Sequence, residues 1–326
     1  MGAPPDERPH YHRGLAAGEN TANAKLARLA VQQFANGTPF DPRAHMVEFE
    51  AFMEAKKHND TYLDLFLREY FTRRGNGIEA EHAGKNQRDM WSIGSMGGLV
   101  VSLPAALANV YAGEAAAVAR GIELAFMTHK SPNVAEGLAL LVPTLVALIM
   151  RPSAPFEEDM ERCESILDAA LARARRPVLR GDELRCKYKE SKGPGKIPKD
   201  EMWRMHTKRS RKSFLDEINE QMLWQAADYD VVGNLLTEAC YPEGGVLGAI
   251  FFARKYSRDP MAAFEASTSC GGDSTSRGSV LGSIVGAVHG RDGLPKRLVD
   301  GLKDAADVRA DIGAFVDLVV RGEDVW

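Results

Sequence analysis

The chain has 326 residues and a formal net charge of −4 at neutral pH. Its hydrophobic fraction of 44% is enough for a buried core, which excludes a low-complexity or intrinsically disordered chain. The small negative charge by itself says nothing about partners.

Cysteine usage and hydropathy point to a cytoplasmic protein with no membrane partner. The four cysteines lie far apart without metal-type spacing, which is typical of reduced thiols. The polar, Pro-rich start is not a secretory signal. The longest apolar run, residues 138–150, is too short to span a bilayer, and Pro143 within it predicts a buried, kinked helix.

Helical periodicity runs through nearly the whole chain, and alternating strand patterns are almost absent. Asp41 and Pro42 form a good N-cap and first-turn pair for the second helix, and Asp60 or Thr61 is expected to cap the third. Helices are expected at residues 24–34, from 42, from 62, and at 100–110, 115–127, 136–150, 157–174, 213–229, 246–256, 260–268, 276–288 and 295–304. The pattern predicts a polar extension over residues 1–17 and one all-α domain over residues 18–326.

A basic excursion at residues 173–212 interrupts this pattern, with fifteen Lys and Arg against five Asp and Glu. It could be a loop that meets phosphate, but such charge runs are more often solvated surface, and we favour that interpretation. Nucleic-acid binding is the least favoured function, because only Tyr188 and Trp203 interleave with the charges.

The most informative motif is Gly271-Gly272-Asp273-Ser274-Thr275-Ser276. Hard oxygen ligands at the start of a helix suit Mg²⁺ or an anion. In the helix that follows, Gly278, Gly282 and Gly286 leave one face without side chains. We expect another helix to approach that face closely.

This motif resembles the C-terminal metal motif Gly-Gly-Asp-Thr-Asp-Thr of the ADP-ribosylglycohydrolase superfamily. Gly18-Glu19-Asn20-Thr21 stands where that family has Thr-Asp-Asp-Thr, Met96-Gly97 where it has Asn-Gly, and Thr128-His129 where it has Thr-His. Residues 11–14, 58–62, 97–100 and 277–282 resemble a divergent branch that includes selenoprotein J and the lens J-crystallins.

The resemblance implies a compact orthogonal helical bundle that holds one or two Mg²⁺ ions between its acidic motifs and hydrolyses ADP-ribosyl bonds. Position by position, it makes Glu19, Asn20, Asp273, Thr275 and Ser276 the metal ligands. Only Glu19 and Asp273 remain charged, so the prediction is one Mg²⁺ in a weakened site, with these two residues as catalytic bases.

The resemblance also suggests ligand contacts from Asp60, Gly97, Gly98 and His129. Structural alternatives stay open for most of these residues. Asp60 and Asp273 are good helix N-caps, Glu19 could serve a capping box, and His129 could be a satisfied core histidine.

Two functions remain open at this point. The first is a Mg²⁺-dependent hydrolase of an ADP-ribosyl or related ribosyl bond. The second is a catalytically silent relative that binds such a ligand or serves a structural, crystallin-like role. The expected partner is an ADP-ribose-like small molecule. The family's extra N-terminal helix does not precede Gly18. Either the sequence is truncated, or the chain dispenses with this helix and exposes an apolar patch that the second subunit of a homo-oligomer could cover.

Overall fold

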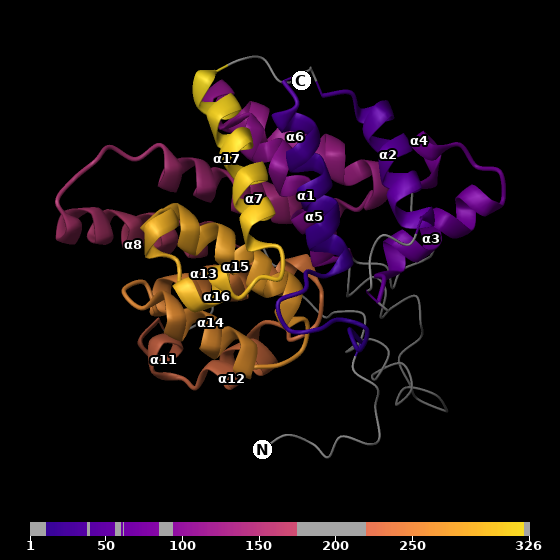
Figure 1. The fold of residues 1–326 in the computed structure, drawn as a ribbon. Helices are drawn as coiled ribbons and strands as arrows, with labels where there is room; N and C mark the ends of the chain where they lie inside the picture. The colour runs from indigo at the N-terminus through magenta and orange to yellow at the C-terminus, as the bar shows by residue number, and fades with distance from the viewer. Residues whose placement is uncertain are drawn as a thin grey trace, which may run out of the picture.

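The computed structural model describes residues 11–37, 40–55, 60, 62–84, 94–174 and 220–322. These residues form helices without a β-strand, which confirms the all-α prediction (Figure 1). Nearly all of the basic excursion lies outside the described residues, and so do His58, Asn59, Thr61 and Trp91.

The helices of the first half run to residue 173. Their bounds are α1 Ala22–Ala35, α2 Pro42–Glu54, α3 Leu65–Gly75, α4 Ala80–Ala83, α5 Met96–Ala108, η1 Val110–Ala112, α6 Glu114–Thr128, α7 Pro132–Ile149 and α8 Phe156–Arg173. Those of the second half are α11 Glu220–Gln225, α12 Asp228–Asp230, η3 Val231–Leu235, α13 Pro242–Lys255, α14 Pro260–Ser269, α15 Ser274–His289, η4 Arg291–Gly293, α16 Lys296–Asp300 and α17 Ala305–Arg321.

Helices α5, α7, α13 and α15 pack together and contribute most of the main core. Almost every side chain of α5 and α13 is buried, as expected for helices that are apolar on all sides. Among the described helices, α7 alone is long and apolar enough to pass a composition test for a membrane span. Half of that window is buried inside the protein, and core helices pass the same test.

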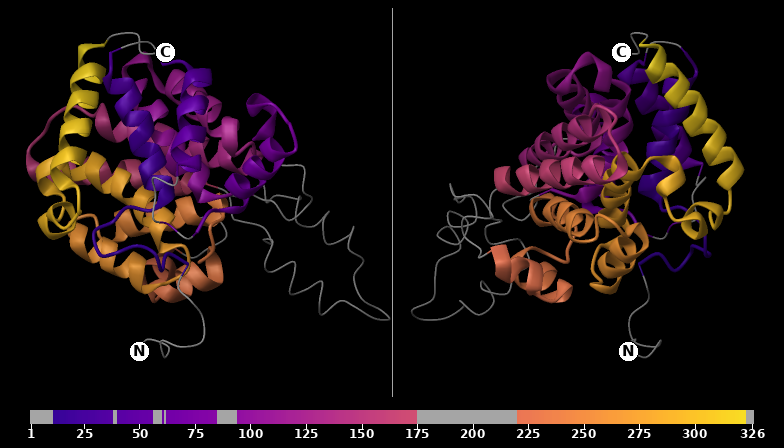
Figure 2. Two further views of the ribbon diagram at one scale, coloured as in Figure 1. Left: turned by 45° about the vertical axis from the view of Figure 1, so that its right-hand side comes forward. Right: turned by 90° about the vertical axis from the view of Figure 1, so that its left-hand side faces the viewer.

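The C-terminal helix α17 lies beside α1, so the two ends of the described chain pack together (Figures 1 and 2). Phe315 of α17 meets Phe34 of α1 edge to face at 6.0 Å. Arg28 donates to Asp311 at 2.5 Å and also pairs with Asp304. The sequence analysis did not predict α17, and it extended α16 four residues too far.

Two further local predictions were wrong. The cap of α3 is Asp64, whose carboxylate accepts the Leu67 N–H at 3.0 Å, and not Asp60 or Thr61. Among the described residues, the side-chain-free face of α15 meets only the Phe264 ring of α14, which would lie 3.8 Å from a methyl group at Gly282. A methyl group at Gly278 or Gly286 would find no atom within 4 Å, because α15 turns its bulky apolar side chains toward the core instead.

Candidate functional site

The starts of α5 and α15 are bound to one short segment that precedes α13. The carbonyl of Glu238 accepts the N–H of Asp273 at 2.7 Å. Two residues later, the carbonyl of Cys240 accepts the N–H of Met96, also at 2.7 Å. The two family-like motifs at these helix starts are therefore close in space although they are far apart in sequence.

The starts of α1 and α3 join them. The carboxylate of Asp60 accepts the N–H of Ala22 in the first turn of α1 at 2.9 Å, and the N–H of Tyr62 at 3.0 Å. A methyl group at Gly97 would lie 2.6 Å from the side-chain nitrogen of Asn23, so α1 and α5 approach very closely here.

Helices α7 and α13 also begin in this region. A methyl group at Gly94 would lie within 3.3 Å of side-chain atoms of both Ser131 and Pro242. Asn133 of α7 donates to Glu243 of α13 at 3.2 Å. Six helix N-termini therefore gather in one region. Their partial positive charges favour an anionic group.

A buried polar network supports the start of α5. The Asp64 carboxylate accepts hydrogen bonds from His129 Nε2 at 2.9 Å and from the Ser95 hydroxyl at 3.2 Å. The other ring nitrogen, Nδ1, bonds the Thr128 hydroxyl at 2.8 Å. Burial opposes ionisation of Asp64, but the His129 imidazole and these hydrogen bonds outweigh it and hold the pKa of Asp64 below its usual value.

His129 therefore lies behind the predicted ligand loop. Its side chain is fully buried, and a methyl group at Gly98 would lie 2.8 Å from its Cβ. The Gly97 N–H bonds the Ser95 hydroxyl and the Gly98 N–H bonds the Ser95 carbonyl. In this arrangement both glycines allow tight packing, and their N–H groups already have partners.

Asp60 holds a second group of side chains at the start of α1. His12 Nδ1 bonds its carboxylate at 2.7 Å, and the side chain of Asp60 is almost fully buried. The ring of Tyr62 packs edge-on against His12 and against the exposed Tyr11. Burial raises the pKa of Tyr62, and the charges of Cys240, Asp64 and Asp273 add to this effect.

The two predicted catalytic acids are placed differently. Glu19 Oε1 bonds the Lys303 ammonium at 2.5 Å, and Glu19 Oε2 accepts the Ala16 N–H. Asp273 caps α15: its Oδ1 accepts the Ser276 N–H at 3.1 Å. Asp273 therefore lies at the start of α15, whereas Glu19 contacts the loop before α17.

The remaining predicted metal ligands flank these acids. The Thr275 hydroxyl donates to Asp273 at 3.0 Å, and Ser276 is buried in the first turn of α15. Asn20 is half-buried directly before Thr21, whose hydroxyl accepts the Ala24 N–H as the N-cap of α1.

Arg277 lies beneath the Asp273 loop with a side chain that is only 1% exposed. Its guanidinium donates to the carbonyls of Ser267 at 2.6 Å and Gly271 at 2.8 Å, and to the Ser267 hydroxyl at 3.1 Å. Within the part of the chain that the structure describes, Nη1 has no hydrogen-bond partner. Burial lowers the pKa of Arg277, and the charges of Cys270, Asp273 and Glu238 oppose that effect.

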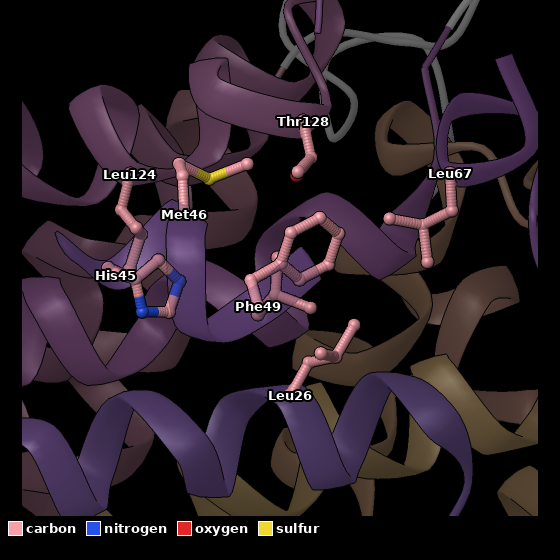
Figure 3. Close-up of a pocket in the computed structure, with 8 residues that line it drawn as sticks. Leu26, His45, Met46, Phe49, Leu67, Leu124 and Thr128 are labelled. Atoms are coloured by element: carbon pink, nitrogen blue, oxygen red, sulfur yellow. The ribbon is translucent and has the colours of Figure 1, made fainter. Parts of the chain in front are cut away.

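The described residues enclose a small cavity that is lined in part by Leu67 and Thr128, which bond the Asp64 and His129 side chains (Figure 3). Its volume is about 10 Å³, room for one water molecule and too small for a nucleotide. Figure 3 labels seven of its lining residues: Leu26, His45, Met46, Phe49, Leu67, Leu124 and Thr128.

Comparison with known families accounts for the gathered helix starts. The ADP-ribosylglycohydrolase family matches residues 2–325, almost the whole chain. The chain is a member of the ADP-ribosylglycohydrolase family. This confirms the resemblance at the level of the family, while its placement in the selenoprotein J and J-crystallin branch stays a prediction.

A solved structure shows the same fold. It is described as an ADP-ribosylglycohydrolase-related protein complex, and it matches with a TM-score of 0.54 and 18% sequence identity. The match covers 92% of this chain and 81% of that chain. A comparison with curated protein sequences finds no match. ADP-ribosylglycohydrolases hydrolyse ADP-ribosyl bonds and are typically dependent on a divalent metal ion.

The arrangement of charges does not fit the predicted Mg²⁺ site. Among the described residues, no three His, Cys, Asp or Glu side chains form a metal-binding group. Lys303 bonds Glu19, and the buried Arg277 bonds the Gly271 carbonyl two residues before Asp273. Mg²⁺ is held largely by carboxylate charge, and here one predicted carboxylate is paired with a cation while a buried cation holds the loop of the other.

The sequence analysis did not identify several residues of this region. Asp64, Ser95 and Lys303 were not singled out, and Arg277 entered only as part of a motif. A buried acid inside an otherwise apolar helix start was the one available signal for Asp64. Nothing local marks Lys303, because its partner Glu19 lies 284 residues away in sequence.

Proposed function

We propose that this chain binds an ADP-ribosyl group at the gathered helix N-termini and hydrolyses the glycosidic bond of its ribose. The observation that carries the proposal is the meeting of six helix starts, three of which (α1, α5 and α15) bear family motifs. Such a region offers partial positive charge to a diphosphate without requiring a net positive protein.

The aromatic side chains at the edge of this region would receive the nucleobase. Tyr11 is 74% exposed and packs against Tyr62, with ring centroids 5.2 Å apart. An exposed ring supported by a half-buried one suits stacking on a purine.

We assign the base of the reaction to Asp273. The Ser276 N–H and the Thr275 hydroxyl orient its carboxylate. In the proposed step the carboxylate accepts a proton from water while the water oxygen bonds to the anomeric carbon of the ribose. The bond to the aglycone breaks, and the leaving group takes up a proton. Glu19 is the second predicted acid, but its pairing with Lys303 makes it the weaker candidate.

A turnover assay tests this function. ADP-ribose release from an ADP-ribosylated protein should fall about 100-fold or more in Asp273→Asn, because the amide cannot accept the proton. Asp292→Asn is the matched control, since Asp292 is 89% exposed in a surface pair, and it should leave the rate unchanged. If the wild-type protein releases no ADP-ribose and no ribose from nucleoside-like substrates, the hydrolase proposal fails.

A catalytically silent relative is the second candidate. The specific observation in its favour is that Glu19 is paired with Lys303 and that the buried Arg277 holds the loop before Asp273. Titration calorimetry separates the two functions. Binding of ADP-ribose without turnover supports a silent binder, whereas neither binding nor turnover supports a purely structural role.

A further inference from the structure

Arg277 is the buried charge that the proposed function leaves unexplained. Its guanidinium holds the loop before α15 through two backbone carbonyls and one hydroxyl. No carboxylate is among these partners, and Nη1 bonds no described atom. The charge is therefore enclosed in the protein without a direct counter-ion.

A purely mechanical role would not require this charge. Burying a cation without a bonded counter-ion is costly, and a neutral donor could hold the same carbonyls. The guanidinium bonds the Gly271 carbonyl, and two residues later the Asp273 N–H bonds the Glu238 carbonyl, so two acids lie on the segments that meet at the start of α15. The position of Arg277 thus adds positive charge where the second motif meets the site.

The motif also carries less negative charge than the family pattern. Asp273 is its only carboxylate, because Thr275 stands where the family pattern has a second acid. Arg277 follows two residues later. Compared with that pattern, the loop has lost a negative charge, and a buried arginine follows it.

We propose that the guanidinium of Arg277 supplies, at the start of α15, the positive charge that a divalent ion supplies in other family members. The chain then binds its ADP-ribosyl ligand without a metal ion. This inference depends on the proposed ADP-ribosyl ligand, but it does not require that the chain hydrolyses this ligand. Arg277 acts as a positioning residue: it holds the Asp273 loop and places a positive charge beneath it.

Calorimetry on the intact protein with Mg²⁺ alone tests the metal part. The wild-type chain should give no saturable heat with Mg²⁺. Arg277→Gln removes the competing charge beside Asp273, so this variant should gain measurable Mg²⁺ affinity. The proposal would be overturned if the wild type bound Mg²⁺ saturably and Asp273→Ala abolished this binding. This outcome would count whether or not the chain binds ADP-ribose.

ADP-ribose titrations test the ligand part. The wild-type Kd should be equal in EDTA and in Mg²⁺, whereas Arg277→Gln in EDTA should bind about tenfold more weakly or worse. Mg²⁺ should restore part of the affinity of Arg277→Gln, which a merely structural role would not allow. Equal wild-type and Arg277→Gln affinities in EDTA would contradict the proposal, and so would a wild-type Kd that depends on Mg²⁺.

Control variants guard against a folding defect. Arg277→Lys keeps a charge and should stay closer to the wild type than Arg277→Gln in EDTA. Arg291→Gln removes an 89% exposed arginine after α15 and should change nothing. Thermal unfolding of each variant checks the fold. If no variant bound ADP-ribose under any condition, ADP-ribose would not be the ligand and the proposed function would fail. The Mg²⁺ titrations would still show whether the charge of Arg277 prevents metal binding.

Discussion

At the scale of residues, the buried pair of Asp64 and His129 holds the start of α5 in place. Both side chains are at most 3% exposed, and the carboxylate also caps α3 through the Leu67 N–H. The pair joins three helices at one point. Its loss should therefore affect stability more than any exposed ion pair would.

Asp64→Asn tests this role. The amide places an NH₂ group where the carboxylate now accepts hydrogen bonds, leaving a buried donor unsatisfied. We expect the free energy of unfolding to fall by about 3 kcal/mol, measured by urea denaturation. Glu81→Gln, in an exposed pair with Arg43, should change it by less than about 0.5 kcal/mol. Equal effects of the two substitutions would contradict a buried network.

His45 predicts a dependence of stability on pH. Burial lowers its pKa from 6.5 to about 4. The unfolded chain therefore binds a proton more readily between these values, and stability falls as the pH drops from about 6.5 to 4. The contribution is at most about 3 kcal/mol. In His45→Gln this part of the pH dependence should disappear from urea midpoints measured at pH 7 and pH 5.

At the scale of elements, the loop before α15 depends on two glycines with left-handed backbones. Gly271 has a φ of 71° and Gly272 a φ of 66°. A methyl group at Gly271 would meet nothing within 4 Å, whereas one at Gly272 would lie 1.9 Å from the Glu238 carbonyl oxygen. The two positions share the backbone requirement and differ in the space around them.

The two alanine substitutions should therefore differ. Gly271→Ala costs only backbone strain, about 1 kcal/mol. Gly272→Ala also pushes Asp273 away from the Glu238 carbonyl, so it should lower ADP-ribose affinity as well as stability. Calorimetry and urea denaturation of both variants measure this. If Gly271→Ala were the more harmful change, the loop geometry would be wrong.

Element types were predictable from the sequence, and their partners were not. The caps Asp41 and Asp273 follow from local residue preference, which needs no knowledge of the fold. The glycine face of α15 shows what the sequence could not predict. The spacing of the glycines reveals a helix face without side chains, but it does not reveal whether another helix covers that face. Pairing of Glu19 with Lys303 likewise depends on packing between distant segments.

At the scale of the whole molecule, α17 ties the end of the chain to the first motif. Its apolar residues include the buried Phe315 and the exposed Ile312, Val316 and Val320. The buried Phe315 and Leu318 nevertheless lie three residues apart on one face of an amphipathic helix, a pattern that the sequence analysis passed over. The loop before α17 in turn bonds Gly18 and Glu19 through Lys303.

Phe315→Ala should therefore act at a distance. Removing the ring from its contact with Phe34 should cost about 3–4 kcal/mol and loosen the loop that holds Glu19. Val320→Ala, on the same helix but 63% exposed, should cost less than about 0.5 kcal/mol. Thermal and urea unfolding compare the two, and equal losses would mean that α17 does not pack on α1.

The complete burial of the His129 imidazole predicts a feature of the proton NMR spectrum. Asp64 can only accept, so Nε2 carries the proton that joins ring and carboxylate, and no solvent reaches it. That proton should exchange slowly and resonate far downfield in a proton NMR spectrum. A single resolved line would then report, in intact protein, whether α3, α5 and α6 remain assembled while ligands or substitutions perturb the surface above them.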